Sequence, residues 1–185
     1  FTLSKVFQYR NIAKKGEDTK EANLLMEKGS LCNHQAISTL AVVGKTSVLV
    51  SSRPGIAILS TGNELVEPSA TPLPHQIRNS NGSVLRALCS RYSPFIEQAI
   101  AQDDPEILEK TINRLSANKI LIVSGGVSMG TADFVPGALK NAGYKEIFHK
   151  IKIKPGKPFW FGVKENGHVA FGLPGNPVSC QVCFK

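Results

Sequence analysis

The residues of this sequence best suited to chemistry are a glycine-rich loop and the carboxylates near it. The loop, residues 124–130 (Ser-Gly-Gly-Val-Ser-Met-Gly), lies between an expected strand and an expected helix, so its free N–H groups are placed to hold an anion. Asp133 lies three residues beyond this loop, and Glu64 follows the Thr-Gly-Asn turn after an earlier strand. If both loops meet, Glu64 and Asp133 form a pair of hard oxygen ligands for Mg²⁺, with Asp103 as a candidate third.

Each of these residues also has a simpler interpretation. The glycine loop could be an ordinary turn, because it matches neither the Walker A loop nor the GxGxxG dinucleotide fingerprint. Asp133 and Asp103 are placed where a carboxylate caps a helix or complements its first turn. A loop glutamate such as Glu64 is usually solvated surface. The loop alone therefore does not imply ATP or NAD.

A run of lysines lies in residues 150–157. Three of them alternate with isoleucines, which predicts a strand over residues 148–153 with the lysines on one face. Such a strand could be an edge strand that lysines protect against aggregation. The Pro-Gly-Lys-Pro turn at residues 155–158 favours another interpretation, because it fixes Lys157 beside the glycine loop as part of a clamp for an oxyanion or phosphate. A second rigid loop, residues 173–179, opens the last helix.

The cysteines do not form a disulfide framework in a chain of this size, which predicts a reducing, cytoplasmic compartment. Cys180 and Cys183 have the spacing of half a zinc site or of a redox pair. No second such pair and no close histidine pair accompanies them, so packing in the core beneath a helix is the favoured interpretation.

Composition excludes several classes of protein. The chain has 185 residues, 42% hydrophobic and 19% charged, which is unlike a disordered chain, a collagen repeat or a disulfide-rich miniature. Its formal net charge of +8 suits nucleic acid, a membrane surface or small anions. The lysines lack interleaved exposed aromatics or a nucleic-acid-binding motif. No apolar run approaches the ~18 residues of a membrane span, and no basic amphipathic helix is evident. Small anionic ligands are therefore the expected partners, with no nucleic acid and no membrane.

The elements that must position these residues alternate between strand and helix. Strands are expected over residues 56–59, 95–100, 119–123, 148–153, 159–163 and 168–171, and helices over 81–92, from 105 onward, over 133–141 and over 177–184. Fully apolar strands in such an alternation predict an α/β domain with a mostly parallel sheet covered on both faces. Ligands of these sheets bind at the carboxyl ends of the strands, which is where the candidate loops lie.

The first 53 residues differ from the rest. They contain a charged stretch of mixed sign, a short apolar run and a strand expected over residues 47–50, but too few apolar residues for a core of their own. We therefore expect residues 1–53 to be part of an N-terminal or linker domain and residues 54–185 to form the α/β domain.

Six segments, taken in order, resemble the MoeA family of molybdopterin molybdenumtransferases, which includes the gephyrin E-domain and its plant counterpart. The matching segments are residues 60–65 (Ser-Thr-Gly-Asn-Glu-Leu), 76–81 (Gln-Ile-Arg-Asn-Ser-Asn), 103–105, 124–134, 154–158 (Lys-Pro-Gly-Lys-Pro) and 172–179 (Gly-Leu-Pro-Gly-Asn-Pro-Val-Ser). The resemblance implies a three-layer, MogA-like molybdopterin-binding domain preceded by part of a linker domain. It also implies an enzyme that inserts molybdate into adenylylated molybdopterin and releases AMP with the help of Mg²⁺.

The resemblance also assigns roles to individual residues. It makes Asp133, Glu64 and Asp103 the active-site carboxylates, with Glu64 and Asp133 as metal ligands. It assigns contacts to molybdate or pterin phosphate to Ser128, Lys154, Lys157 and Ser179, with Lys150 in the same cleft, and the other substrate contacts to Thr61, Gly62, Asn81, Ser124, Gly125, Gly126, Pro155, Gly156, Pro174, Gly175, Asn176 and Pro177.

This chain departs from the family pattern in several respects. Asn63 stands where many members have Asp, and members are about twice as long as this chain, with a C-terminal β domain and a dimeric site. We therefore expect a homodimer at full length, and slow or absent turnover by these 185 residues alone. The alternatives are a non-catalytic molybdopterin-binding or scaffolding module and an enzyme of the preceding adenylylation step. The converging charged residues favour catalysis.

Overall fold

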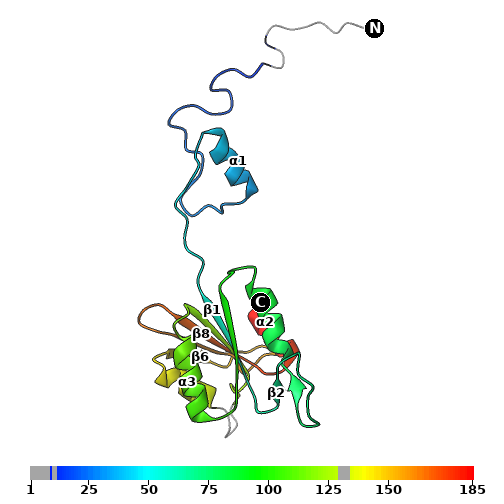
Figure 1. Cartoon of the computed structure of the whole chain (residues 1–185). Helices are drawn as coiled ribbons and strands as arrows, with labels where there is room; N and C mark the ends of the chain where they lie inside the picture. The colour runs from blue at the N-terminus through cyan, green and yellow to red at the C-terminus, as the bar shows by residue number, and fades with distance from the viewer. Residues whose placement is uncertain (1–8, 10–11, 129–133) are drawn as a thin grey trace, which may run out of the picture. The chain divides into compact units, whose positions relative to one another are not determined.

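Two units make up the chain, Phe1–Ser51 and Ser52–Lys185. The structure, a computed structural model, describes residue 9 and residues 12–128 and 134–185 (Figure 1). Within these residues no helix is long and apolar enough to cross a membrane.

The first unit has one helix in its described part, α1 (His34–Val42). The Asn33 side chain caps it by accepting a hydrogen bond from the N–H of Ala36 at 3.0 Å. The strand expected over residues 47–50 is not formed, and that prediction was wrong. The described part of this unit offers no second strand to complete a ladder, so the apolar side chains of Leu49 and Val50 are exposed.

A six-stranded sheet forms the centre of the second unit, in the order β4-β1-β5-β8-β7-β6. Its strands are β1 (Ile56–Thr61), β4 (Ile96–Ala101), β5 (Ile120–Ser124), β6 (Lys145–His149), β7 (Trp160–Val163) and β8 (Val169–Leu173). The first four strands in this order are parallel, and β7 and β6 extend the sheet in antiparallel fashion. A separate parallel pair consists of β2 (Leu65–Val66) and β3 (Ile77–Arg78). The mostly parallel α/β sheet that the sequence predicts is confirmed.

Helices cover both faces of this sheet, as Figure 1 shows for α3 (Pro105–Leu115) on one side and α2 (Ser80–Cys89) with the end of the chain on the other. The alternating side chains of β1 account for the two layers. Leu59 packs in one core with Leu108 of α3 and Leu139 of α4 (Val135–Asn141). Ile58 packs in the other core with Leu85 of α2 and with α5 (Pro177–Phe184). Every residue of β1 is buried, as its continuous apolar run predicts.

The lysine segment departs from the sequence prediction. β6 begins at Lys145 and ends at His149, four residues before the end of the strand expected over residues 148–153, so that expectation was wrong. Lys150 adopts a φ of 75°, in the left-handed region, which breaks the alternation of an extended strand. The lysines that follow therefore lie on an irregular segment, residues 150–158, and not along one face of a strand; we call this segment the lysine turn.

Helix starts follow the capping residues of the sequence. Asp104 caps α3 by accepting hydrogen bonds from the N–H groups of Glu106 and Ile107, and Pro105 takes the first helical position. Asn176 caps α5 in the same way. The helix expected from residue 133 begins at Val135, and Asp133 lies outside the described residues.

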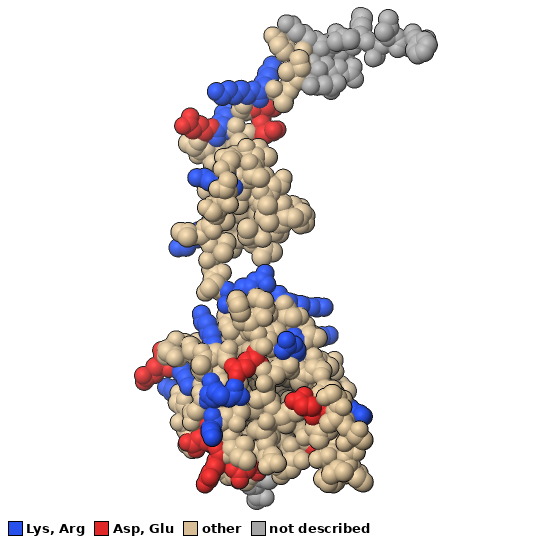
Figure 2. All heavy atoms as spheres, viewed as in Figure 1, with Lys and Arg blue, Asp and Glu red and all other residues tan. Residues whose placement is uncertain are grey.

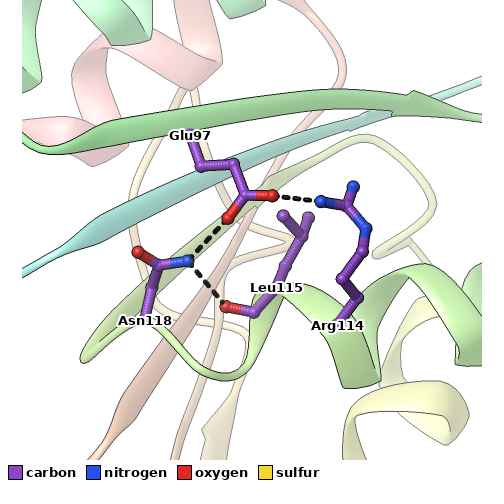
Figure 3. A network of polar contacts seen from close by, with 4 residues as sticks. All are labelled: Glu97, Arg114, Leu115 and Asn118. Carbon is purple, nitrogen blue, oxygen red and sulfur yellow. Dashed lines mark hydrogen bonds and ion pairs between the residues drawn. The ribbon is translucent and has the colours of Figure 1, made fainter.

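A polar network fixes the edge strand β4 to the end of α3 (Figure 3). The Glu97 carboxylate accepts a hydrogen bond from Arg114 and another, at 3.0 Å, from the Asn118 amide. The same amide donates to the carbonyl of Leu115 at 3.2 Å. This network orders the turn that leads into β5 and lies away from the carboxyl ends of the strands.

Charged side chains of both signs occupy the surface that Figure 2 shows. On this face of the second unit, lysines and arginines are interspersed with aspartates and glutamates. The net charge of +8 is therefore not gathered into one basic surface on this side of the molecule.

Candidate functional site

A hollow of about 480 Å³ lies where β1, β5 and β8 end at their carboxyl edges. Its lining consists of the three loops that follow these strands, one residue after β4 and one residue of the lysine turn. The residues are Thr61, Gly62, Glu64, Asp103, Gly125, Gly126, Val127, Ser128, Pro158, Pro174, Gly175, Asn176 and Ser179. We call this the polar hollow.

Two carboxylates face the polar hollow from the loops after β1 and β4. Glu64 folds back over Gly62, where a Cβ would lie 2.6 Å from the carboxylate oxygen Oε2. The Asn63 side-chain oxygen accepts a hydrogen bond from the backbone N–H of Asp103 at 3.1 Å. Asn63 therefore holds the two loops together, a positioning role that a neutral amide performs without adding a third negative charge beside Glu64 and Asp103.

The glycine loop packs too closely against the end of β1 for any other residue type. Gly125 has a φ of 99°, and a Cβ there would lie 2.6 Å from the carbonyl oxygen of Thr61. Gly126 has a φ of 62°, and a Cβ there would lie 2.7 Å from the side chain of Val135. Because side chains are excluded at both positions, the backbone itself forms this wall of the polar hollow.

Two hydroxyl groups at the end of β1 lack a partner within the described part of the chain. Ser60 Oγ and Thr61 Oγ1 are both buried and make no hydrogen bond there. Such groups cost free energy unless something pairs with them. Thr61 borders the polar hollow, and both residues border a smaller adjoining hollow of about 90 Å³. A polar ligand at this edge of the sheet would satisfy them.

Asn81 connects the smaller hollow to the loop after β8. Its side-chain amide donates to Ser124 Oγ at 2.9 Å and to the Gly175 carbonyl at 2.8 Å. Asn176 in turn accepts from the N–H groups of Val178 and Ser179, which fixes the start of α5 beside the hollow. The loops after β5 and β8 and the first turn of α2 are therefore held as one rigid surround.

The lysine turn lies next to the polar hollow without lining it. Lys150, Lys154 and Lys157 are exposed, and of residues 150–158 only Pro158 contributes to the wall. Gly156 is the buried residue of the turn. The positive charges of these lysines therefore lie outside the wall of the polar hollow, at its edge. Pro155 is exposed with them and is likewise not part of the wall.

The structure brings together most of the residues selected from the sequence. Apart from the lysine turn and Asp133, which lies outside the described residues, each of them borders one of the two hollows. Within the described residues no group of three or more His, Cys, Asp or Glu side chains is arranged to hold a metal ion. The sequence did not predict that Val127 and Pro158 line the polar hollow or that Asn63 connects two of its loops. Of these three roles, only that of Asn63 had a signal in the sequence, namely its position inside the loop after β1.

The α/β region has the sequence features of a known family. Residues 57–185 match the family model described as a probable molybdopterin binding domain. A curated relative named molybdopterin molybdenumtransferase, from Staphylococcus epidermidis, is 34% identical over 190 residues, which cover 100% of this chain and 45% of the relative. A protein of the same name from Synechocystis is 36% identical over 92% of this chain and 44% of its own length. The chain thus spans less than half the length of these relatives.

Solved structures show the same architecture. The molybdopterin biosynthesis MoeA protein of Pyrococcus horikoshii superposes with a TM-score of 0.78 at 33% identity, over 91% of this chain and 42% of that protein. The molybdopterin biosynthesis enzyme MoaB of Thermus thermophilus superposes with a TM-score of 0.52 at 13% identity, over 69% of this chain and 85% of its own. The second likeness concerns the fold alone.

Proposed function

This chain belongs to the family of molybdopterin-binding domains, and from that premise we propose that it carries the catalytic α/β domain of a molybdopterin molybdenumtransferase. The proposed reaction inserts molybdate into adenylylated molybdopterin and releases AMP. One observation carries the proposal: three strand-end loops and the carboxylates of Glu64 and Asp103 converge on one polar hollow, together with the buried Thr61 hydroxyl, which has no hydrogen-bond partner within the described residues. The name shared by the bacterial relatives supports the same reaction.

The backbone and hydroxyl groups of the polar hollow would bind the substrate's polar atoms. Gly125 and Gly126 allow a phosphate to approach the main chain closely. Ser128 is exposed at the wall, and Thr61 presents a hydroxyl that has no partner within the described residues. Hydrogen-bond donors fixed before the ligand arrives stabilise developing charge without reorganising. This arrangement favours a transition state with extra charge on phosphate oxygens.

The carboxylates suit a magnesium ion shared with the substrate. Glu64 and Asp103 line the same hollow, and Mg²⁺ usually takes one or two carboxylates together with substrate phosphates. We propose Asp133 as a further ligand, on its resemblance to the family motif. When bound, the ion would neutralise charge on the phosphoanhydride as it breaks. Asn63 keeps Asp103 close to Glu64 through its hydrogen bond to the Asp103 backbone.

The lysines at the rim supply positive charge to an anionic substrate. Lys154 and Lys157 are exposed on the turn beside the polar hollow, where they would attract molybdate and contact it as it enters. Lys150, exposed at the start of the same segment, adds a third positive charge. We assign no nucleophilic side chain, because an oxygen of molybdate or of water can attack the phosphoanhydride.

We further propose that the complete protein works as a cytoplasmic homodimer. Its resemblance to the family supports the dimer. The cysteines at positions 32, 89, 180 and 183 are all free, which suits a reducing compartment.

Substitution of Glu64 in the complete protein tests the proposed function. Glu64→Gln keeps the shape of the side chain and removes its charge, so molybdate-dependent AMP release should fall about 100-fold or more. Glu67→Gln removes a nearby exposed carboxylate outside both hollows and should leave the rate unchanged. Asp133→Ala should also abolish AMP release. Unchanged rates in both Glu64→Gln and Asp133→Ala would overturn the catalytic assignment.

A further inference from the structure

Two thiols on α5 make polar contacts with the loops of the candidate site. Cys183 Sγ donates a hydrogen bond to the carbonyl oxygen of Gly156, with 3.4 Å between sulfur and oxygen. Cys180 Sγ lies 3.8 Å from Ser124 Oγ, within hydrogen-bonding distance for sulfur. The sequence favoured core packing for this pair, and Cys180 is indeed buried in the core beneath α5. Core packing alone does not account for both sulfurs meeting polar atoms of two site loops.

Cys183 fixes the middle of the lysine turn. A Cβ on Gly156 would lie 2.5 Å from Cys183 Sγ, so the sulfur rests directly on the glycine Cα. Gly156 also has a φ of 120°, which favours glycine. The turn is closed by a hydrogen bond of 3.0 Å from the Ile151 N–H to the Lys157 carbonyl. The thiol therefore anchors the one buried residue between Lys154 and Lys157, both of which are exposed.

Cys180, about one turn earlier in α5, contacts a hydroxyl that borders the smaller hollow. Ser124 Oγ accepts a hydrogen bond from the Asn81 amide at 2.9 Å. With the Cys180 thiol as a second donor, both acceptor positions of this oxygen are used, and its own proton is left to donate to a ligand. Cys180 thus sets the direction in which Ser124 donates.

Both cysteines are held in the protonated form that can donate. Burial raises the pKa of the Cys180 thiol and that of the Cys183 thiol above their ordinary value. At neutral pH each sulfur therefore carries its proton, and neither is poised as a nucleophile.

We infer that Cys180 and Cys183 are positioning residues of the site, Cys183 for the lysine turn and Cys180 for the Ser124 hydroxyl. The roles of the turn and the hydroxyl in turnover rest on the proposed function. The positioning itself is a property of the fold and can be measured without turnover.

The sharpest test compares alanine and serine at position 183 in the complete protein. Cys183→Ala removes the donor to Gly156, and the KM for molybdate should rise roughly fivefold, the factor expected for one lost hydrogen bond, with little change in kcat. Cys183→Ser restores an O–H donor and should return KM to near the wild-type value. Cys89→Ala is the matched control, because it also removes a buried core thiol, but one that lies outside the polar hollow and the smaller hollow beside it. It should lower stability and leave KM unchanged.

Position 180 is tested on the other substrate. Cys180→Ala should raise the KM for adenylylated molybdopterin, and Cys180→Ser should restore it. If both alanine variants match Cys89→Ala in KM, or if serine fails to restore it at both positions, the positioning roles are wrong and the thiols only pack the core.

Hydrogen exchange separates this inference from the proposed function. In Cys183→Ala, backbone amides of residues 150–159 should exchange severalfold faster than in Cys183→Ser, with no substrate present. If the wild-type protein inserts no molybdate but Cys183→Ala still shows the faster exchange, the proposed function is wrong and the positioning role of Cys183 stands. Equal exchange in both variants would overturn the positioning role whatever the enzyme does.

Discussion

Two hollows of similar size lie at opposite ends of α5 and have opposite chemistry. The polar hollow has a volume of about 480 Å³, and the second, apolar hollow about 440 Å³. The apolar hollow is lined by Pro54, Ile56, Cys89, Tyr92, Ile120, Ile122, Phe159, Phe171, Leu173, Cys183 and Phe184. Asn176 and Ser179 at the start of α5 border the polar hollow, whereas Cys183 and Phe184 at its end border the apolar one.

The difference follows from which part of the same strands each hollow touches. β1 begins at Ile56 in the apolar hollow and ends at Thr61 in the polar one. Within the sheet, successive side chains of a strand point to opposite faces. Both faces are covered by helices, so the side chains on both are apolar. At the carboxyl ends the chain leaves the ladder, so backbone groups and capping side chains are free to meet a ligand. Size alone therefore says little about function, whereas the position along the strand and the lining chemistry say much.

The largest expected effect comes from filling the polar hollow's backbone wall. Gly125→Ala places a methyl group 2.6 Å from the Thr61 carbonyl at a φ of 99°, so the loop must move away from the end of β1. We expect AMP release to fall about 100-fold or more, because the preorganised donors are lost. Gly137→Ala on α4 places a Cβ that has no atom of the described residues within 4 Å, and it should be neutral or stabilise by about 0.5–1 kcal/mol. Full activity in Gly125→Ala would show that this wall does not contact substrate.

A matching change in the apolar hollow should affect stability and not substrate binding. Phe171 contacts the rings of Phe159 and Phe161, with centroids 6.3 Å and 5.0 Å away. Phe171→Ala should cost about 3 kcal/mol of unfolding free energy, measured by urea denaturation, because it removes a packed aromatic ring. The KM for both substrates should stay within about twofold of wild type, because Phe171 does not line the polar hollow and its loss should lower only the stability of the fold. A raised KM would mean that the two hollows are not separate in function.

The contrast between these hollows also shows where sequence reasoning succeeded. Continuous apolar runs and capping signals, such as Asp104 before Pro105, predicted the parallel sheet and the start of α3 almost to the residue. The polar residues gathered at strand ends were predicted as well, since glycines and prolines there mark loops. These features depend on local chemistry, which a sequence displays directly.

Sequence reasoning failed where the outcome depends on the backbone of a single residue or on distant partners. The alternation of lysine and isoleucine indicated a strand, but the left-handed conformation of Lys150 ends β6 at His149. The segment 47–50 had strand composition, yet a strand needs a partner that the described part of the first unit lacks. The contact of Cys183 with Gly156 joins residues 27 positions apart and has no signal in the local pattern.

The thiol of Cys89 distinguishes the hollows by its pH dependence. Burial raises its pKa from 9.0 to about 11. Below pH 9 the thiol is protonated in both the folded and the unfolded chain, so its contribution to stability is fully present. Between pH 9 and about 11 only the unfolded chain loses the proton, and stability should fall by about 1.4 kcal/mol per pH unit. Urea unfolding of wild type and Cys89→Ala at pH 8 to 10.5 should show a steeper decline for wild type. Parallel curves would mean that water reaches this side of the apolar hollow.

The smallest effect is expected from a site remote from both hollows. Glu97 receives hydrogen bonds from Arg114 and Asn118 at the edge of the sheet, where the Arg114 and Glu97 side chains are 57% and 40% exposed. Because solvent screens an exposed ion pair, Arg114→Ala should cost less than about 1 kcal/mol of unfolding free energy and change neither KM. Glu97→Gln keeps an acceptor for Asn118 and should cost less still. If Arg114→Ala instead impaired AMP release, a change at the turn before β5 would be affecting the glycine loop at the other end of that strand. The polar residues at the strand ends would then not act independently of the packing along the rest of the sheet.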